Sequence, residues 1–235
     1  MADKQLSALT AASAIADANL FYVEQSGNSR KATGTQLKAY TAYGGGGLEA
    51  APTAPASASF TLQNAGTAAL SDVANGMLLS VPSATSNIRF AKHTAGPSSF
   101  TSFTMTWRAE MATFTANVGY TNCGILRDSG TGKIIMFGEY QRGATMVAQR
   151  WSSYTAFSAN AVTPLTAPVT RYYPWRRMTV ASGTITFYVS VDGVTWISIG
   201  TEPVATYITT INEVGVGSFT SNEDASTVVN SFTIA

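Results

Sequence analysis

The stretch FTMTWRAEM (103–111) decides the fold class of this chain. Apolar and polar residues alternate along it, which places the apolar side chains on one face of an extended strand. The other face carries threonine, arginine and glutamate. We therefore predict a half-buried β-strand whose inward residues are Phe103, Met105, Trp107, Ala109 and Met111.

A second stretch, TITFYVSV (184–191), has the same alternation. The Asp192-Gly193 dipeptide that follows is typical of a two-residue hairpin turn. VTWISI (194–199) is then expected to return as the partner strand. The predicted inward residues of the first strand are Ile185, Phe187, Val189 and Val191.

Outward from these strands, residues 59–235 contain many short apolar segments separated by Gly, Asn, Asp, Ser and Pro. No long helical pattern occurs after residue 60, so the predicted fold class is all-β, an antiparallel sandwich or barrel. The further strand candidates are SFTLQ (59–63), GMLLSV (76–81), SNIRFAK (86–92), CGILRD (123–128), KIIMFGEY (133–140), TMVAQRW (145–151), WRRMTV (175–180), EVGVGSF (213–219) and VVNSFTIA (228–235).

A composition break precedes the β-rich region. Residues 41–58, TAYGGGGLEAAPTAPASA, combine four consecutive glycines with two prolines and are predicted to form a linker. Residues 1–40 contain a predicted hairpin, LFYVEQ (20–25) and SRKAT (29–33) around a Ser-Gly-Asn turn, before a short helix, TQLKAYTAY (35–43). About 40 residues are too few for a stable core, so this module is expected to pack on copies of itself or on a larger particle. Its predicted anchoring residues are Leu20, Phe21, Tyr22, Val23, Leu37 and Tyr40.

Charge is sparse along the whole chain. Hydrophobic residues make up 45% of the sequence, charged residues only 11%, and the formal net charge is +1. This balance gives no basic footprint for nucleic acid, and no apolar run is long enough for membrane insertion. The densest basic spot, Arg171 with Trp175, Arg176 and Arg177, is interpreted as the solvated end of one strand.

The lone cysteine, Cys123, excludes an internal disulfide and indicates folding in a reducing cytosol. The start of the chain lacks the pattern of a secretory signal. With His93 the only histidine, a Cys–His pair is not indicated, and we expect Cys123 to be a small buried thiol.

Several motifs resemble a known family. The sequence carries LRDS (126–129) before TGK, then Arg150-Trp151, Pro174-Trp175, and the Ser190-to-Trp196 hairpin. Their order is similar to that of concanavalin A-like jelly rolls, in particular those at the ends of phage tail and fibre proteins. The N-terminal ALTAASAIADANLFYVEQSGNSRKATGTQLKAY resembles a leader found at the start of many phage structural proteins.

These resemblances imply a virion protein made in the host cytoplasm and displayed on the surface of the phage particle. Its implied partners are capsid or tail proteins held through residues 1–40, other copies of itself in a homotrimer, and host surface polysaccharide. The jelly roll specifies the fold but not the function.

Catalytic residues are not predicted. Glycosidases need two carboxylates across the scissile bond, whereas Glu110, Glu139 and Glu213 each lack a second acid at a spacing of two. A single histidine disfavours a histidine-based metal site, and no cofactor is expected. A calcium site at Asp128 or around 222–224 stays an open alternative.

A carbohydrate site would need exposed aromatic rings beside a few polar groups. The best candidates for such a platform are Tyr154, Tyr172, Tyr173 and Trp196, although Trp196 is equally compatible with packing on the sandwich. Trp107, Trp151 and Trp175 are expected to be packed. Arg150, Arg176 and Arg177 are suited to acidic sugars, but ordinary strand-face roles are favoured.

Three functions follow as hypotheses. The first is a virion fibre, spike or decoration protein, with or without a ligand. The second is a carbohydrate-binding module that recognises a bacterial surface glycan, on the particle or free. The third, a cryptic glycosidase, is disfavoured because paired acids are absent.

Overall fold

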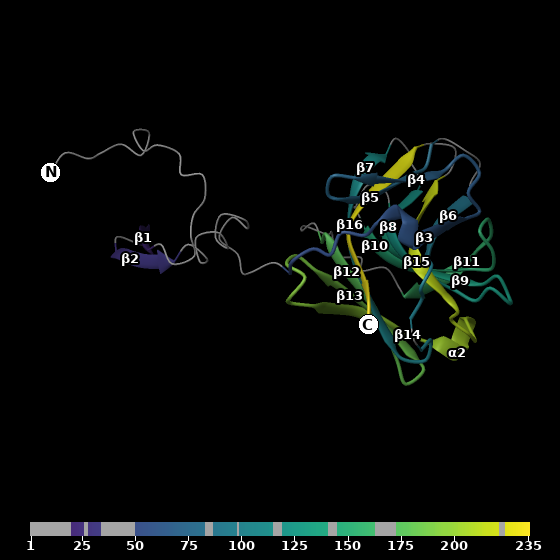
Figure 1. Cartoon of the computed structure of the whole chain (residues 1–235). Helices are drawn as coiled ribbons and strands as arrows, with labels where there is room; N and C mark the ends of the chain where they lie inside the picture. Colours follow the sequence, from purple (N-terminus) through teal and green to yellow (C-terminus); the bar gives the residue numbers. More distant parts are fainter. Residues whose placement is uncertain are drawn as a thin grey trace. The chain divides into compact units, whose positions relative to one another are not determined.

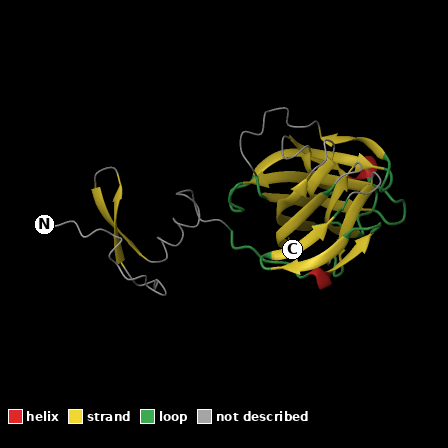
Figure 2. Cartoon of the chain, turned by 90° about the horizontal axis from the view of Figure 1, so that it is seen from above, coloured by secondary structure: helices red, strands yellow, loops and turns green. Residues whose placement is uncertain are grey.

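Two seven-stranded antiparallel sheets account for the β-rich part of the chain. The computed structural model describes residues 20–25, 28–33, 50–82, 87–97, 99–114, 119–140, 145–162, 173–220 and 224–235. The chain divides into two units, Met1–Glu49 and Ala50–Ala235. The described part of the second unit is almost entirely β, with brief helical turns at Ser57–Ser59 and α2 (Val204–Tyr207) beside its two layers of strands (Figures 1 and 2).

Sheet I has the strand order β11-β10-β9-β8-β15-β6-β3. Its neighbouring strands all pair antiparallel. The strands are β3 (Phe60–Gln63), β6 (Asn87–His93), β8 (Gly119–Arg127), β9 (Ile134–Tyr140), β10 (Thr145–Trp151), β11 (Phe157–Val162) and β15 (Glu213–Thr220).

Sheet II has the order β14-β13-β12-β7-β16-β5-β4. The consecutive strands β15 and β16 lie at matching positions of opposite sheets, so the chain crosses from one sheet to the other between them. The strands are β4 (Ala69–Val73), β5 (Gly76–Ser80), β7 (Phe103–Phe114), β12 (Trp175–Ala181), β13 (Thr184–Ser190), β14 (Ile197–Pro203) and β16 (Ala225–Ile234). The predicted all-β antiparallel sandwich is confirmed.

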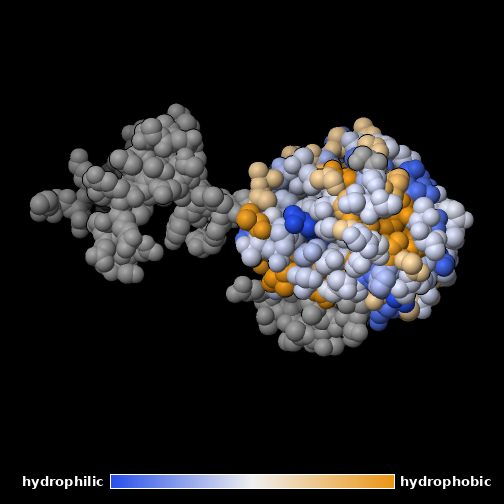
Figure 3. Space-filling model, turned by 90° about the horizontal axis from the view of Figure 1, so that it is seen from below, coloured by the Kyte–Doolittle hydropathy of each residue, from blue (hydrophilic) through white to orange (hydrophobic). Residues whose placement is uncertain are grey.

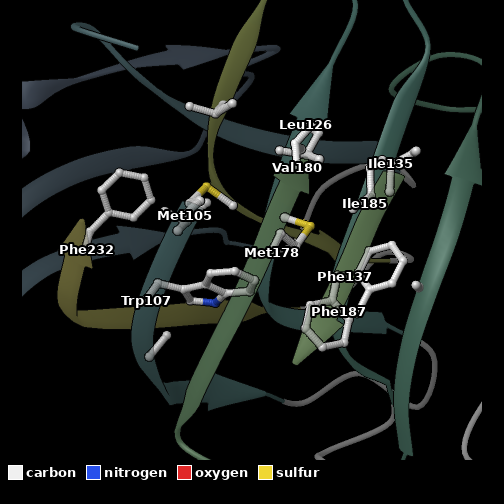
Figure 4. Close-up of a cluster of buried hydrophobic side chains, with 14 of the residues drawn as sticks. Met105, Trp107, Leu126, Ile135, Phe137, Met178, Val180, Ile185, Phe187 and Phe232 are labelled. Carbon is white, nitrogen blue, oxygen red and sulfur yellow. The ribbon is translucent and has the colours of Figure 1, made fainter. Parts of the chain in front are cut away.

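The core fills the space between the sheets (Figure 4). Trp107 lies fully buried within it, and its indole Nε1 donates a hydrogen bond to the carbonyl of Asn122 at 2.9 Å. A Cβ added to Gly124 would lie 2.4 Å from the indole ring, so β8 approaches Trp107 only because residue 124 lacks a side chain. The other labelled core side chains in Figure 4 are Met105, Leu126, Ile135, Phe137, Met178, Val180, Ile185, Phe187 and Phe232.

Two inward assignments from the alternation are wrong. Met111 is exposed. Its partner on β16 is Thr227, and the pairing of β7 with β16 shifts register between Ser226 and Thr227, so the inward–outward alternation is interrupted at Met111. Val191 is exposed because β13 already ends at Ser190.

The predicted two-residue hairpin at Asp192-Gly193 is also wrong, since β14 begins only at Ile197. The Oδ1 atom of Asp192 accepts hydrogen bonds from the backbone N–H groups of Val194 (2.8 Å) and Thr195 (2.7 Å). These bonds hold a wider loop than the dipeptide alone predicts. Strands β4 and β11 were not among the predicted segments, because ALSDV lacks an apolar alternation and the apolar residues that alternate after Phe157 in FSANAV are only alanines.

The sandwich begins earlier than residue 59. Ala50 donates its N–H to the carbonyl of Asp192 (2.6 Å), and Thr53 both donates to Ser231 Oγ (2.9 Å) and accepts from Phe232 N (3.0 Å). The end of the predicted linker is therefore part of the C-terminal unit, because its backbone pairs with the sandwich.

The described part of the N-terminal unit is a hairpin. β1 (Leu20–Gln25) pairs antiparallel with β2 (Asn28–Thr33), so both predicted strands are confirmed. Asn28 is the first residue of β2 rather than a turn residue, since it pairs with Gln25. Leu20, Phe21, Tyr22 and Val23 lie on β1, whereas the predicted helix with Leu37 and Tyr40 lies outside the described residues.

Candidate carbohydrate-binding site

The outer face of sheet I carries a set of aromatic residues that we call the aromatic face: Tyr120, Tyr140, Trp151, Phe157 and Phe219. They come from β8, β9, β10, β11 and β15. Tyr120 pairs across the sheet with both Tyr140 and Phe219, so these three side chains lie on the same side of sheet I. Trp151 pairs with Phe157, so these two side chains also lie on one side. Trp151 and Phe219 belong to a buried cluster separate from the inter-sheet core.

The rings of the aromatic face touch one another. Tyr120 and Tyr140 stack with ring centroids 4.8 Å apart, and Trp151 lies 4.8 Å from Phe219 and 5.5 Å from Phe157. Such contacts fix the ring orientations before any ligand arrives.

Exposure changes across the aromatic face. Trp151 and Phe219 are buried, Tyr120 and Tyr140 are half-buried, and Phe157 is 51% exposed. Phe157 packs edge-on against Trp151, at an interplanar angle of 77°. An exposed ring on a rigid aromatic base has the form of a platform for the apolar face of a sugar.

Polar groups lie beside these rings. The amide Nε2 of Gln149 donates to the hydroxyl of Tyr120 (2.8 Å) and to Oδ1 of exposed Asn160 (3.3 Å). Its Oε1 accepts from the indole Nε1 of Trp151 at 3.2 Å. Burial raises the pKa of Tyr120, so its hydroxyl keeps its proton near neutral pH. The face thus combines aromatic surface with amide and hydroxyl groups suited to sugar hydroxyls.

Tyr154 lies on the same side of sheet I. It packs against the aromatic cluster, its carbonyl accepts from Ile88 N (2.8 Å), and the guanidinium carbon of Arg127 lies 4.9 Å from its ring centroid. Tyr154 is half-buried, and burial raises its pKa. Its ring therefore borders the aromatic face rather than standing free.

The other predicted platform residues lie elsewhere. Trp196 belongs to the sheet II side, where Arg177 stacks on its ring, and half-buried Tyr173 packs against the core between the sheets. Tyr172 lies outside the described residues. The structure thus places Tyr154 and Trp196 on different sheets, so they do not form one platform.

Sequence reasoning missed Tyr120, Tyr140, Gln149, Phe157 and Asn160. The period of two along β10 and β11 puts Gln149 and Trp151 on one side, but their meeting with Tyr120 depends on pairing across the sheet. The register shift in β8 between Thr121 and Gly124 contains Asn122 at φ 55°, a conformation that asparagine tolerates, but an asparagine alone does not predict a shift at this position.

Each glutamate whose side chain the structure describes pairs with an arginine, in the pairs Glu110–Arg108, Glu139–Arg176, Glu202–Arg150 and Glu213–Arg127. Glu139 and Glu202 are buried. Each of these carboxylates is thus engaged by an arginine, whereas a glycosidase needs two acids placed across the bond that it cleaves.

The interpretation of the basic spot as a solvated strand end is wrong for Arg176, which is buried and points between the sheets. Trp175 is buried beside Gly193 and Ala50. Arg171 lies outside the described residues. Trp107, Trp151 and Trp175 are packed, as predicted.

Asp128 closes a turn. Its Oδ1 accepts from the backbone N–H groups of Gly130 (2.9 Å) and Thr131 (3.3 Å), and these bonds lower its pKa although partial desolvation opposes them.

Within the described residues, no group of three or more His, Cys, Asp or Glu side chains gathers to hold a metal ion. None of the described helices is long and apolar enough to span a bilayer.

Cys123 is fully buried, as predicted, and burial raises the pKa of its thiol far above the ordinary range. A protonated buried thiol is a poor nucleophile.

His93 stacks on Phe232 at 5.3 Å and meets Phe60 edge-on, and burial lowers its pKa.

Comparison with known proteins shows the fold. No family model and no curated protein matches the chain. A protein of unknown function from Saccharomyces cerevisiae is similar at 14% identity and TM-score 0.54, over 77% of this chain and 97% of that one. The carbohydrate-binding module CBM66 from Bacillus subtilis is similar at 12% identity and TM-score 0.51, over 75% and 94%. The exoplasmic/lumenal domain of VIP36, in its calcium- and mannose-bound form, is similar at 12% identity and TM-score 0.50, over 75% and 82%. The C-terminal unit is therefore a concanavalin A-like jelly-roll sandwich.

Proposed function

We propose that the C-terminal unit is a non-enzymatic carbohydrate-binding module, and that residues 1–40 attach it to a bacteriophage particle. In this role it is a fibre, spike or decoration protein on the virion surface that recognises a host-surface glycan. The observation that carries the proposal is the aromatic face, where exposed Phe157 rests on Trp151 beside Gln149 and Asn160.

The physics of sugar recognition supports the aromatic face as the ligand site. A pyranose presents apolar C–H groups on one side and hydroxyls at its rim, so it suits an exposed ring flanked by amides. Phe157 offers the ring, and exposed Asn160 and the Tyr120 hydroxyl offer hydrogen bonds. The pairing of the described glutamates with arginines supports binding without hydrolysis.

Two observations support the role on the particle: the resemblance of the N-terminal leader, and the small size of the N-terminal unit. The leader resembles that of phage structural proteins, and a unit of 49 residues needs a partner surface to be stable. We expect a homotrimer held through this unit, with capsid or tail proteins as its other partners. A ligand-free decoration protein is the alternative, since the leader and linker serve either role.

A direct test measures glycan binding by the full chain. We expect the wild type to bind a set of bacterial surface polysaccharides on a glycan array, with affinities then measured by titration calorimetry. Phe157→Ala should weaken binding about 5- to 30-fold, because the loss of one stacked ring removes about 1–2 kcal/mol. The matched control is Val73→Ala, another exposed apolar residue, on β4 of sheet II, which should bind as the wild type does.

Two results would count against the proposal. One is the absence of binding to host cells and to every polysaccharide beside positive controls. The other is unchanged affinity in Phe157→Ala. The particle role is tested separately: removal of residues 1–40 should abolish incorporation into virions, and normal incorporation would exclude it.

A further inference from the structure

The outer face of sheet II is lined with hydroxyl groups. Thr201 pairs across the strands with Thr186, Thr186 with Thr179, and Thr179 with Thr104, so one row of threonines crosses four neighbouring strands. The hydroxyls of Thr104 and Thr179 lie 3.3 Å apart. Such a surface is polar but uncharged. Figure 3 shows one face of the molecule, on which pale residues surround orange patches and strongly hydrophilic residues are scattered.

The next row contains a single cation. Arg177 pairs across the sheet with Tyr188 on β13 and Thr106 on β7, which in turn pair with Ser198 and Thr233. Because directly opposed residues share a side of the sheet, this row also faces outward. Arg177 therefore lies at the centre of a surface of hydroxyl and phenol groups.

The guanidinium of Arg177 is held in a fixed orientation. Its carbon lies 3.9 Å from the ring centroid of Trp196, and its Nε donates to the hydroxyl of Thr106 at 3.1 Å. Stacking on an indole and one hydrogen bond restrict the side chain without neutralising its charge.

Among the residues that the structure describes, Arg177 has no carboxylate partner, unlike the neighbouring arginines. Arg108, Arg127, Arg150 and Arg176 each pair with a glutamate. For Arg177, the bonds within the described part of the chain use only Nε, and both terminal nitrogens lack a protein acceptor. Those two nitrogens form the parallel fork that matches the two oxygens of a carboxylate.

We propose that Arg177 and Trp196 form a second ligand site, on the sheet opposite the aromatic face, that binds the carboxylate of an acidic sugar. The carboxylate accepts two hydrogen bonds from the terminal nitrogens of Arg177. The hydroxyls of Thr233, Ser198 and Tyr188, on the same row, face the rest of the sugar. One free cation suits the single charge of a uronic acid better than the larger charge of a phosphate monoester.

The test titrates the full chain with oligogalacturonate and with its methyl ester, which keeps the sugar but removes the charge. We expect the acid to bind and the ester to bind at least 10-fold more weakly. Arg177→Gln should lower the affinity for the acid about 10- to 100-fold, as expected for hydrogen bonds to charged groups. Arg177→Lys should restore only part of it, because lysine lacks the fork.

Controls separate this site from general charge and from unspecific effects of substitution. Arg108→Gln removes a neighbouring cation that is already paired with Glu110, and Val73→Ala alters an exposed residue of β4 outside this row; both should bind the acid as the wild type does. The idea would be overturned by equal binding of acid and ester, by unchanged affinity in Arg177→Gln, or by tighter binding of a phosphorylated oligosaccharide of equal length. Failure here leaves the proposed function open to its own test, because that test measures the binding of surface polysaccharides by the wild type and by Phe157→Ala.

Discussion

Arg176 of β12 and Glu139 of β9 form a buried ion pair that joins the two sheets. Their side chains are 0% and 3% exposed. Asn122 Nδ2 donates to the second carboxylate oxygen of Glu139 at 2.7 Å, and Arg176 Nη1 reaches the carbonyls of Ala109 (3.3 Å) and Pro174 (3.2 Å). Because either ion alone would be buried without compensation, we expect this pair to favour the observed facing of the two sheets.

Breaking this pair should be costly. We expect Arg176→Met or Glu139→Gln to lower the free energy of unfolding by about 3–5 kcal/mol, because each leaves a partner unpaired in the core. The double variant should lose less than the sum of the two. Urea unfolding followed by tryptophan fluorescence measures all three. The more exposed pair Arg108–Glu110 is the control, with side chains 25% and 47% exposed, and here Glu110→Gln should cost less than about 1 kcal/mol. Equal effects in the buried and exposed pairs would contradict this account.

The start of the sandwich can be located by truncation. A chain of residues 50–235 should fold and remain monomeric, whereas a chain of residues 59–235 loses the hydrogen bonds of Thr53 to Ser231 and Phe232 and of Ser57 N to Asp72. We expect the shorter chain to be less stable by about 1–3 kcal/mol. Urea midpoints compare the two, and sedimentation gives their mass. Equal stability would show that residues 50–58 contribute nothing to the fold.

Asp192 should make stability depend on pH in acid. Hydrogen bonds from the backbone of Thr195 and Val194, together with Ser190, lower its pKa from 3.8 to about 2 in the folded chain. A depressed pKa stabilises the folded state above pH 3.8, and this contribution is lost as the pH falls toward 2. Asp192→Asn keeps the Oδ1 acceptor but cannot titrate. Its deficit relative to the wild type, from thermal unfolding at several pH values, should shrink toward zero near pH 2. A deficit that is the same at pH 7 and pH 2 would argue against this origin.

Cys123 should be unreactive in the folded protein. It is fully buried, donates its S–H to the carbonyl of Thr121 at 3.2 Å, and has a pKa raised by burial. We expect no labelling by a disulfide reagent at pH 8 over hours, and stoichiometric labelling in 8 M urea. Rapid labelling of the native chain would mean that this side of sheet I opens readily.

The local alternation of apolar and polar residues was enough to predict most strands. It also predicted the buried positions of the most regular one, residues 103–111. Phe103, Met105, Trp107 and Ala109 are buried as the pattern of 103–111 requires. The errors fall where pairing overrides the local period, at Met111 opposite a register shift and at Val191 beyond the end of its strand. Strand β11 escaped prediction although it supplies Phe157, the most exposed ring of the aromatic face.

The candidate site was less predictable than the fold. Tyr154 was identified from its loop-like surroundings and does border the aromatic face, but Tyr120, Tyr140 and Gln149 were not. Their approach requires the order of β8, β9 and β10 in sheet I, which short-range sequence cannot express.

The amino-acid sequence by itself determined the β class, the two-part organisation and the scarcity of charge, because these depend on composition and on a period of two. Only the tertiary structure decided which charges are paired and which rings meet. Arg176 is buried against Glu139, whereas Arg177, the next residue, lies on the outer side and stacks on Trp196. This difference arises because successive side chains of a strand point to opposite sides of the sheet, and the two sides of this sheet face different surroundings. Neighbours in the chain thereby acquired opposite roles, one inside the sandwich and one on its surface.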